Sequence, residues 1–98
     1  AQPDLGLSHY LLGRLLFERG AYDEAQAELG LAMSAHLPDG RFVDQALLLR
    51  GQAALLAGRS QEAQQFFFEL RARAPSGAKR LEAEDMLDRA KRWDSLPP

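Results

Sequence analysis

The sequence contains no cysteine, which excludes disulfide bonds and thiolate metal sites. Histidine is scarce too, with two residues, so the side chains that most often bind zinc are nearly missing. No run of apolar residues approaches the roughly 18 that a membrane-spanning helix needs. The formal net charge is only -2, which gives no overall attraction to nucleic acid or to an anionic membrane. We therefore expect no metal, no membrane span and no nucleic-acid partner.

The overall composition of the sequence is that of a small globular domain. Apolar residues make up 46% of the 98 residues and charged residues 27%, a balance typical of soluble proteins. A chain of this length forms one domain, taken as residues 1–98. Residues 1–40 carry two Arg and six Asp or Glu, whereas residues 41–98 carry ten Arg or Lys and eight Asp or Glu. This asymmetry fits ordinary solvated surfaces, and it also fits steering of a partner or head-to-tail self-association.

The sequence leaves the cellular compartment open. No signal peptide is visible in the chain. The start Ala1-Gln2 fits a mature terminus left after cleavage, which would place the protein in the periplasm. The same start equally fits an artificial boundary in a cytoplasmic protein.

Apolar residues recur at helical spacing and are separated by clear breaks, which predicts five helices and no strand. Gly20 and Gly58 are placed to end helices in the left-handed conformation. Residues 37–40 and 75–77 combine proline and glycine and are expected to be loops. The predicted helices cover about residues 5–19, 22–35, 41–57, 60–74 and 78–93.

The starts and buried faces of these helices follow from residue type. Asp4 and Ser60 are the expected N-caps of the first and fourth helices. The first helix carries a leucine stripe made of Leu5, Leu7, Leu11, Leu12, Leu15 and Leu16. The second helix is expected to bury Ala25, Leu29, Ala32 and Met33. The fifth helix has a weaker stripe of Leu81, Leu87, Ala90 and Met86.

One short pattern occurs twice in the chain. In each copy a glycine is followed seven positions later by a second glycine, and five positions after that by an alanine. The copies are Gly13, Gly20 and Ala25, then Gly51, Gly58 and Ala63. All three positions are offset by the same 38 residues. A constant offset indicates one helix–turn–helix unit used twice.

Such units resemble the tetratricopeptide repeat family, whose pattern places Leu-Gly, Tyr, Ala, Phe and Pro along a unit of 34 residues. Unit one would span about residues 6–39 and unit two about 44–77, and the helix at 78–93 looks like the capping helix after the last repeat. The residues that carry the resemblance are Leu12, Gly13, Gly20, Tyr22, Ala25, Ala32, Gly51, Gly58, Ala63, Phe67 and Pro75. The resemblance implies an all-α fold in which antiparallel helix pairs stack in a right-handed superhelix.

Physical chemistry gives these small residues a role of their own. Gly13 and Gly51 allow two helix backbones to approach closely, and we expect Ala25 and Ala63 to be the small side chains that face them. A larger residue at these positions would overpack the helix interface, at about 1–3 kcal/mol each. One unit alone leaves an apolar face exposed, so neighbouring units must stack.

Three positions depart from the family pattern. His9 stands where the family usually has Trp, Ser60 where it has the turn Tyr, and Arg50 where a Leu precedes the glycine. Arg50 must therefore reach solvent along its aliphatic stem, find a carboxylate, or mark a change of helix register. Two units are also fewer than the three that arrays usually need. The chain would then be part of a longer array, would dimerise, or would depend on the fifth helix.

The resemblance implies a protein–protein interaction scaffold, in which the first helix of each unit lines a concave groove that holds a partner segment. By position in the family, the groove residues would be Leu7, Tyr10, Arg14, Phe17, Gln45, Leu48, Gln52, Leu55 and Lys79, with Glu82 beside the last. Arg14 and Gln52 would be the polar anchors of an otherwise apolar groove. Tyr10 and Phe17 also fit a simpler role, that of packing against the helix behind them.

The alternative function is self-assembly. The chain would then be an oligomerisation module or a fragment of a larger repeat protein, and its spacing is similar to that of repeat proteins of bacterial envelope complexes. Phe66, Phe67 and Phe68 fan across about 200° of a helix, so they cannot all face one neighbour. Phe67 is expected in the core, and Phe66 or Phe68 would meet another helix or another chain. Trp93 is expected to fold onto the end of the stack.

We expect no enzyme and no cofactor. His9 and His36 are isolated from each other, and no zinc-binding helix motif, phosphate-binding loop or nucleophile elbow is present. Adjacent carboxylates such as Asp23 and Glu24 point apart on a helix, which suits solvation rather than acid–base chemistry. The basic group around Pro75 is diluted by glutamates and lacks the interleaved aromatic residues of single-strand binders.

Overall fold

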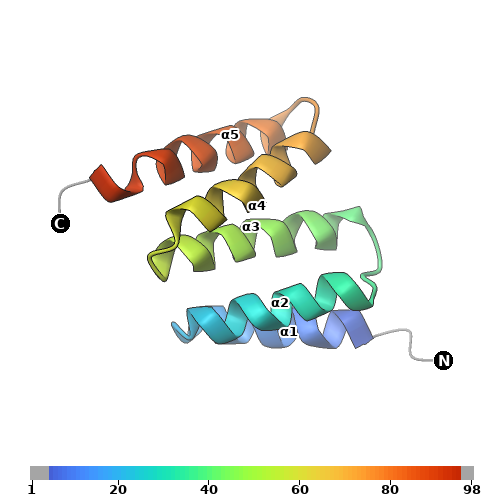
Figure 1. Ribbon diagram of the computed structural model, residues 1–98. Helices are drawn as coiled ribbons and strands as arrows, with labels where there is room; N and C mark the ends of the chain where they lie inside the picture. Colours follow the sequence, from blue (N-terminus) through green and yellow to red (C-terminus); the bar gives the residue numbers. More distant parts are fainter. Residues whose placement is uncertain (1–4, 96–98) are drawn as a thin grey trace.

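The computed structural model describes residues 5–95, which form five α-helices that stack in chain order (Figure 1). The helices are α1 (Leu5–Glu18), α2 (Tyr22–Ala35), α3 (Gly40–Leu56), α4 (Ser60–Arg73) and α5 (Ala78–Lys91). A short 3-10 helix, η1 (Trp93–Ser95), follows α5. Since residues 5–95 contain no strand, the predicted all-α class with five helices is confirmed. Each helix packs mainly on its neighbour in the chain, and the stack measures 48 × 31 × 17 Å.

Two glycines end α1 and α3 in the same way. Gly20 has a φ of 81° and Gly58 a φ of 84°, the left-handed region that favours glycine. The N–H of Ala21, just after Gly20, donates to the carbonyl oxygen of Leu16 at 2.9 Å, and the equivalent bond 38 residues later measures 2.8 Å. This is the Schellman motif. The prediction that Gly20 and Gly58 end helices is therefore confirmed.

The helix starts follow the sequence less closely. Asp39 caps α3, because its carboxylate accepts a hydrogen bond from the backbone N–H of Arg41 at 2.9 Å, and that bond lowers the pKa of Asp39. The prediction of Ser60 as an N-cap is wrong, since Ser60 is the first residue of α4. Its hydroxyl donates to a carboxylate oxygen of Asp94 in η1 at 2.9 Å. The other predicted cap, Asp4, lies outside the described residues.

Close helix contact at Gly13 and Gly51 sets the distance within each helix pair. A Cβ added to Gly13 would lie 2.7 Å from Cγ of Leu29, and one added to Gly51 would overlap the ring of Phe67. The residues opposite the glycines are thus Leu29 and Phe67, not the expected Ala25 and Ala63. Both alanines are fully buried, one helical turn earlier. Because a glycine has no side chain, the large side chain that faces it packs directly on the helix backbone, and the two helices approach closely.

The core consists of two clusters that share α3. One cluster lies between α1, α2 and α3 around Tyr10 and Leu29, and the other lies between α3, α4 and α5 around Leu47 and Phe67. The predicted stripe of α2 is confirmed, with Ala25, Leu29 and Ala32 buried and Met33 partly buried. Helix α3 buries Ala46, Leu47, Leu48, Gly51, Ala53, Ala54 and Leu55. It is therefore the central element of the stack.

The leucine stripe predicted for α1 is not its buried face. Leu5, Leu11, Leu12 and Leu15 are between 42% and 52% exposed, whereas α1 buries Gly6, Tyr10 and Gly13. The reason is that α1 packs on α2 through its small residues and touches α3 only slightly. Leu81, which was assigned to the buried stripe of α5, is 68% exposed, and the buried residues there are Ala83, Leu87 and Ala90. Both errors come from counting apolar residues where small residues make the contact.

We predict opposite effects for the same substitution at two helical glycines. Gly51→Ala should lower the free energy of unfolding by about 1–3 kcal/mol, because the new methyl group overlaps the Phe67 ring. Gly30→Ala should raise it by up to about 1 kcal/mol, because a Cβ there lies at an ordinary distance of 3.4 Å from Arg50 and alanine favours helix. Urea unfolding followed by circular dichroism measures both. Equal effects of the two variants would refute the packing role of Gly51.

Candidate functional site

The residues predicted to line a groove lie on α1, α3 and α5, and the structure divides them into two groups. Phe17, Gln52 and Leu55 line a cavity near the C-terminal ends of α1 and α3. Tyr10 and Gln45 line another, near the start of α3. Lys79 on α5 joins the second group, since its Nζ donates to Oε1 of Gln45 at 3.4 Å.

The first of these, the Trp93 cavity, collects side chains from three helices that are far apart in the sequence. Its volume is about 240 Å³. It is lined by Phe17, Gln52, Leu55, Leu56, Met86, Arg89 and Trp93. The ring of Phe17 also meets Tyr22 edge-on, with 5.5 Å between the ring centroids, so the turn holds it in place. The cavity is apolar, with one amide and one guanidinium among its lining groups.

The second, the Tyr10 cavity, has a volume of about 360 Å³ and is lined by Tyr10, Arg41, Phe42 and Gln45. Tyr10 is only 3% exposed and forms the floor, where its ring packs edge-on against Phe42 with the centroids 5.4 Å apart. The guanidinium of Arg14 lies 5.9 Å from the Tyr10 ring centroid, within reach of a cation–π interaction. Tyr10 thus packs against its neighbours and lines the cavity at the same time.

The remaining groove positions are less accessible. Leu48 is 7% exposed and belongs to the core cluster around Phe67. Leu7 is partly buried and packs against the cluster around Tyr10. Glu82 pairs with Lys79 at 3.6 Å on the surface of α5. None of these three side chains is among the lining residues of the Trp93 cavity or of the Tyr10 cavity.

Sequence reasoning missed the contribution of α5 to the Trp93 cavity. Met86 and Arg89 lie seven residues after Lys79 and Glu82, and Trp93 lies seven after Met86. Residues seven apart share a helix face. Extending the chosen face of α5 by two turns identifies Met86 and Arg89, and a further seven residues lead past the end of α5 to Trp93 in η1. Trp93 also packs against the core as predicted, from η1.

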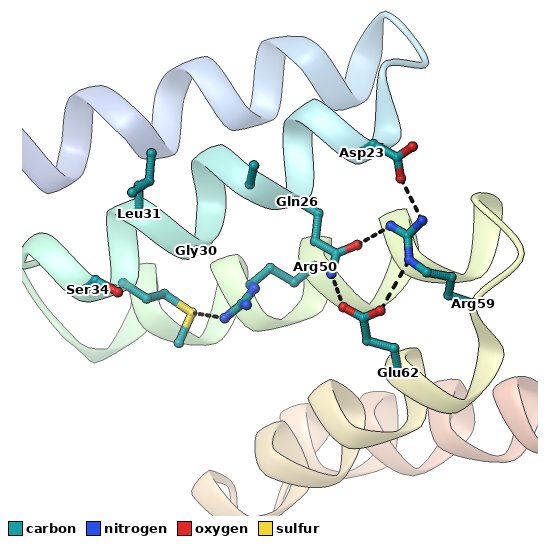
Figure 2. A pocket seen from close by; sticks show the side chains of 10 residues that line it. Asp23, Gln26, Gly30, Leu31, Ser34, Arg50, Arg59 and Glu62 are labelled. Carbon is teal, nitrogen blue, oxygen red and sulfur yellow. Dashed lines mark hydrogen bonds and ion pairs between the residues drawn. The ribbon is translucent and has the colours of Figure 1, made fainter.

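A third cavity, the Arg50 cavity, lies between α2 and α4 (Figure 2). Its volume is about 630 Å³, and its lining includes Gln26, Gly30, Met33, Ser34, Arg50 and Glu62. No sequence pattern indicated it, because its walls come from two helices that the repeat pattern treats as packing elements. Arg50 itself was noted only as a departure from the family.

One end of the Arg50 cavity is closed by a polar network around Arg59. Its Nη1 pairs with Oδ1 of Asp23 at 2.6 Å, and its Nε pairs with Oε2 of Glu62 at 3.2 Å. Its Nη2 donates to Oε1 of Gln26 at 2.6 Å, and the amide of Gln26 donates to Glu62. The hydrogen bond with Asp23 raises the pKa of Arg59. Arg59 is therefore matched by two carboxylates.

Arg50 has no such partner among residues 5–95. Its Nη1 donates to Sδ of Met33 at 3.4 Å, a weak acceptor, and its Nε is buried without a hydrogen bond. The guanidinium carbon lies 4.3 Å from the centroid of the Phe66 ring. Burial lowers the pKa of Arg50, while the charges of Glu69 and Glu62 oppose that effect. The side chain is thus held in place by stacking, and no carboxylate of residues 5–95 is in direct contact with it.

The contact between Arg50 and Phe66 accounts for one of the three consecutive phenylalanines, and the structure also places the other two. Phe67 is in the core as predicted, and Phe66 lies under Arg50 within the same chain. Phe68 is exposed, and Arg71 covers it with 4.8 Å between the guanidinium carbon and the ring centroid. Of the two possibilities that the sequence left open for Phe66, another helix or another chain, the structure shows contact with another helix of the same chain.

Two further features bear on chemistry. His9 lies 3.4 Å from Glu28 on α2, while His36 is exposed at the end of α2. Within residues 5–95, no three His, Cys, Asp or Glu side chains come together as a metal site would require. None of the helices described is long and apolar enough to cross a bilayer.

In comparisons with known proteins, the chain matches no family model, no curated protein and no solved structure.

We predict that Arg50→Leu raises the free energy of unfolding by about 1 kcal/mol. Leucine removes a buried unsatisfied donor, which costs about 1–3 kcal/mol, and this exceeds a cation–π loss of about 0.5–1 kcal/mol. The matched control is Arg71→Leu, which removes the half-buried cation over the exposed ring of Phe68. This control should not raise the free energy of unfolding. Urea unfolding of both variants measures the effect, and an Arg50→Leu variant less stable than the wild type contradicts it.

Proposed function

We propose that this chain is a protein-binding scaffold of the tetratricopeptide type, which holds a segment of a partner along α1, α3 and α5. The 38-residue repeat in the sequence and the stacking of consecutive helices support this family assignment. The observation that carries the proposal is the Trp93 cavity, because α1, α3 and α5 all contribute to it. A site shared by three stacked helices is the arrangement that a groove along the stack requires.

The chemistry of the Trp93 cavity favours one bulky apolar side chain of the partner. Leu55, Leu56, Met86 and Trp93 supply apolar walls. A volume of about 240 Å³ is small for a drug-like ligand, whose sites span about 300–1,000 Å³. Buried apolar anchors of this kind carry most of the binding energy in many interfaces. Gln52 and Arg89 lie beside this position and supply donors for backbone carbonyls of the partner.

A second candidate function is self-assembly, as an oligomerisation module or as part of a larger repeat protein of a bacterial envelope complex. The supporting observation is the outer face of α1. Its four exposed leucines lie on the first helix of the stack. They are Leu5, Leu11, Leu12 and Leu15. Exposed apolar faces of this kind are typical of interaction surfaces.

Peptide selection tests the scaffold. Peptides selected from a random library on the wild-type chain should change the fluorescence of Trp93, which is the sole tryptophan. Leu56→Glu should weaken their binding at least about tenfold, or 1.4 kcal/mol, because a charge replaces an apolar wall. Leu81→Glu is the matched control, on an exposed leucine of α5. Equal affinity of both variants would exclude the Trp93 cavity as the binding site.

Sedimentation tests self-assembly. If the leucine face of α1 joins two copies, the wild-type chain should sediment as a dimer at micromolar concentration. Replacing Leu12 and Leu15 together by glutamate should restore the monomer, because two charges would be buried in an apolar interface. A wild-type chain that stays monomeric at all micromolar concentrations excludes this second function. It does not contradict the proposed scaffold function.

A further inference from the structure

The Arg50 cavity is separate from the Trp93 cavity. Both use α3, but Arg50 and Gln52 are two residues apart, which turns them about 200° from each other around the helix. The two cavities therefore open on opposite sides of α3. Whatever occupies the Arg50 cavity does not compete for the groove described above.

The Arg50 cavity is lined by two arginines and two carboxylates, but only Arg59 makes ion pairs with those carboxylates. Its two carboxylates, Asp23 and Glu62, both pair with Arg59. Arg50 takes part in no ion pair within residues 5–95, although it is partly buried. A partly buried cation normally has a counter-charge, because desolvation destabilises the charge otherwise. Glu62 and Glu69 act on Arg50 only from a distance, so the cavity lacks an acceptor in direct contact with the guanidinium.

The guanidinium is also held in position. The Phe66 ring covers one face of it at 4.3 Å, and Met33 contacts Nη1. A guanidinium has five N–H donors, and within residues 5–95 a single one of them has a hydrogen-bond acceptor, the weakly accepting sulfur of Met33. An arginine that is already fixed loses little side-chain entropy when it binds a ligand.

The wall of α2 next to Arg50 leaves room for a ligand. A Cβ built on Gly30 would lie 3.4 Å from Nη2, so the absence of a side chain at Gly30 keeps the space in front of that nitrogen free. In Figure 2 the Arg50 head lies below the part of α2 that carries Gly30, with Ser34 one turn further on. The Ser34 hydroxyl is a second donor on the same wall.

We propose that the Arg50 cavity binds a carboxylate, with the Nη groups of Arg50 and the Ser34 hydroxyl as donors. A planar carboxylate matches the fork of a guanidinium and accepts paired hydrogen bonds from it. A single negative charge also suits the cavity better than a phosphate dianion, which Asp23 and Glu62 would repel more strongly. The carboxylate belongs either to a free dicarboxylic acid or to an acidic side chain of a partner protein.

Nuclear magnetic resonance on the ¹⁵N-labelled chain tests this proposal through the Nε–H signal of Arg50. The probes are succinate and a capped Ala-Glu-Ala peptide, at constant ionic strength, with a capped Ala-Gln-Ala peptide as the neutral control. We expect a saturable shift with at least one acidic probe and none with the neutral peptide. The tighter acidic probe identifies the source of the carboxylate. No saturable shift with either acidic probe, or an equal shift with the neutral peptide, overturns the proposal.

Two pairs of variants locate the site. Arg50→Gln should weaken binding at least about tenfold, the loss expected for a hydrogen bond to a charged group. Arg71→Gln, which removes the half-buried cation over Phe68, should leave binding unchanged. Equal binding by these two variants overturns the proposal.

The second pair of variants, Gly30→Asp and Gly30→Asn, tests the site even if the Arg50→Gln variant does not fold. Gly30→Asp places a carboxylate of the chain itself beside Arg50, so it should abolish probe binding and raise the midpoint of thermal unfolding above that of Gly30→Asn. An aspartate variant that binds the probe as well as the asparagine variant does, or that melts no higher, contradicts the assignment of Arg50.

Discussion

The contact between a glycine backbone and a large side chain on the facing helix sets the geometry of both helix pairs. Gly13 lies under Leu29 in the first pair, and Gly51 lies under Phe67 in the second. Since protein interiors are packed to near-crystalline density, the close approach of the backbones and the size of the facing side chain must match. The first contact fixes the spacing of α1 and α2, and the second fixes the spacing of α3 and α4. Each of the three cavities has residues of α3 in its lining, so their shapes depend on where α3 lies.

Much of the fold was predictable because its determinants are local. Gly20 and Gly58 end helices through bonds made within a few residues, and the 38-residue offset is visible without any knowledge of tertiary contacts. The errors concern properties that only neighbours decide. Ser60 has the residue type of an N-cap, but its hydroxyl bonds to Asp94, 34 residues later. The leucines of α1 have a helical period, but small residues of α1 make the contact with α2.

The candidate sites were predictable to a lesser degree. Resemblance to a repeat family pointed to Phe17, Gln52 and Leu55, and the structure brings these three together. On α5 the resemblance pointed to Lys79 and Glu82, whereas the residues of α5 that line the Trp93 cavity are Met86 and Arg89. Arg50 stood out in the sequence because a charge replaced an expected leucine. Its environment was not predictable, because stacking on Phe66 and the free space at Gly30 depend on how α2, α3 and α4 meet.

An unpaired cation at Arg50 links ligand binding to the stability of the fold. A buried donor without an acceptor costs about 1–3 kcal/mol, which is a substantial part of the roughly 5–15 kcal/mol that stabilises a typical domain. A ligand that binds only the folded chain stabilises it by about 2.7 kcal/mol at a hundredfold excess over its dissociation constant. A bound carboxylate would therefore offset what Arg50 costs the free chain. Because α3 carries Arg50 on one side and lines the Trp93 cavity on the other, such stabilisation would act on the element that both sites share.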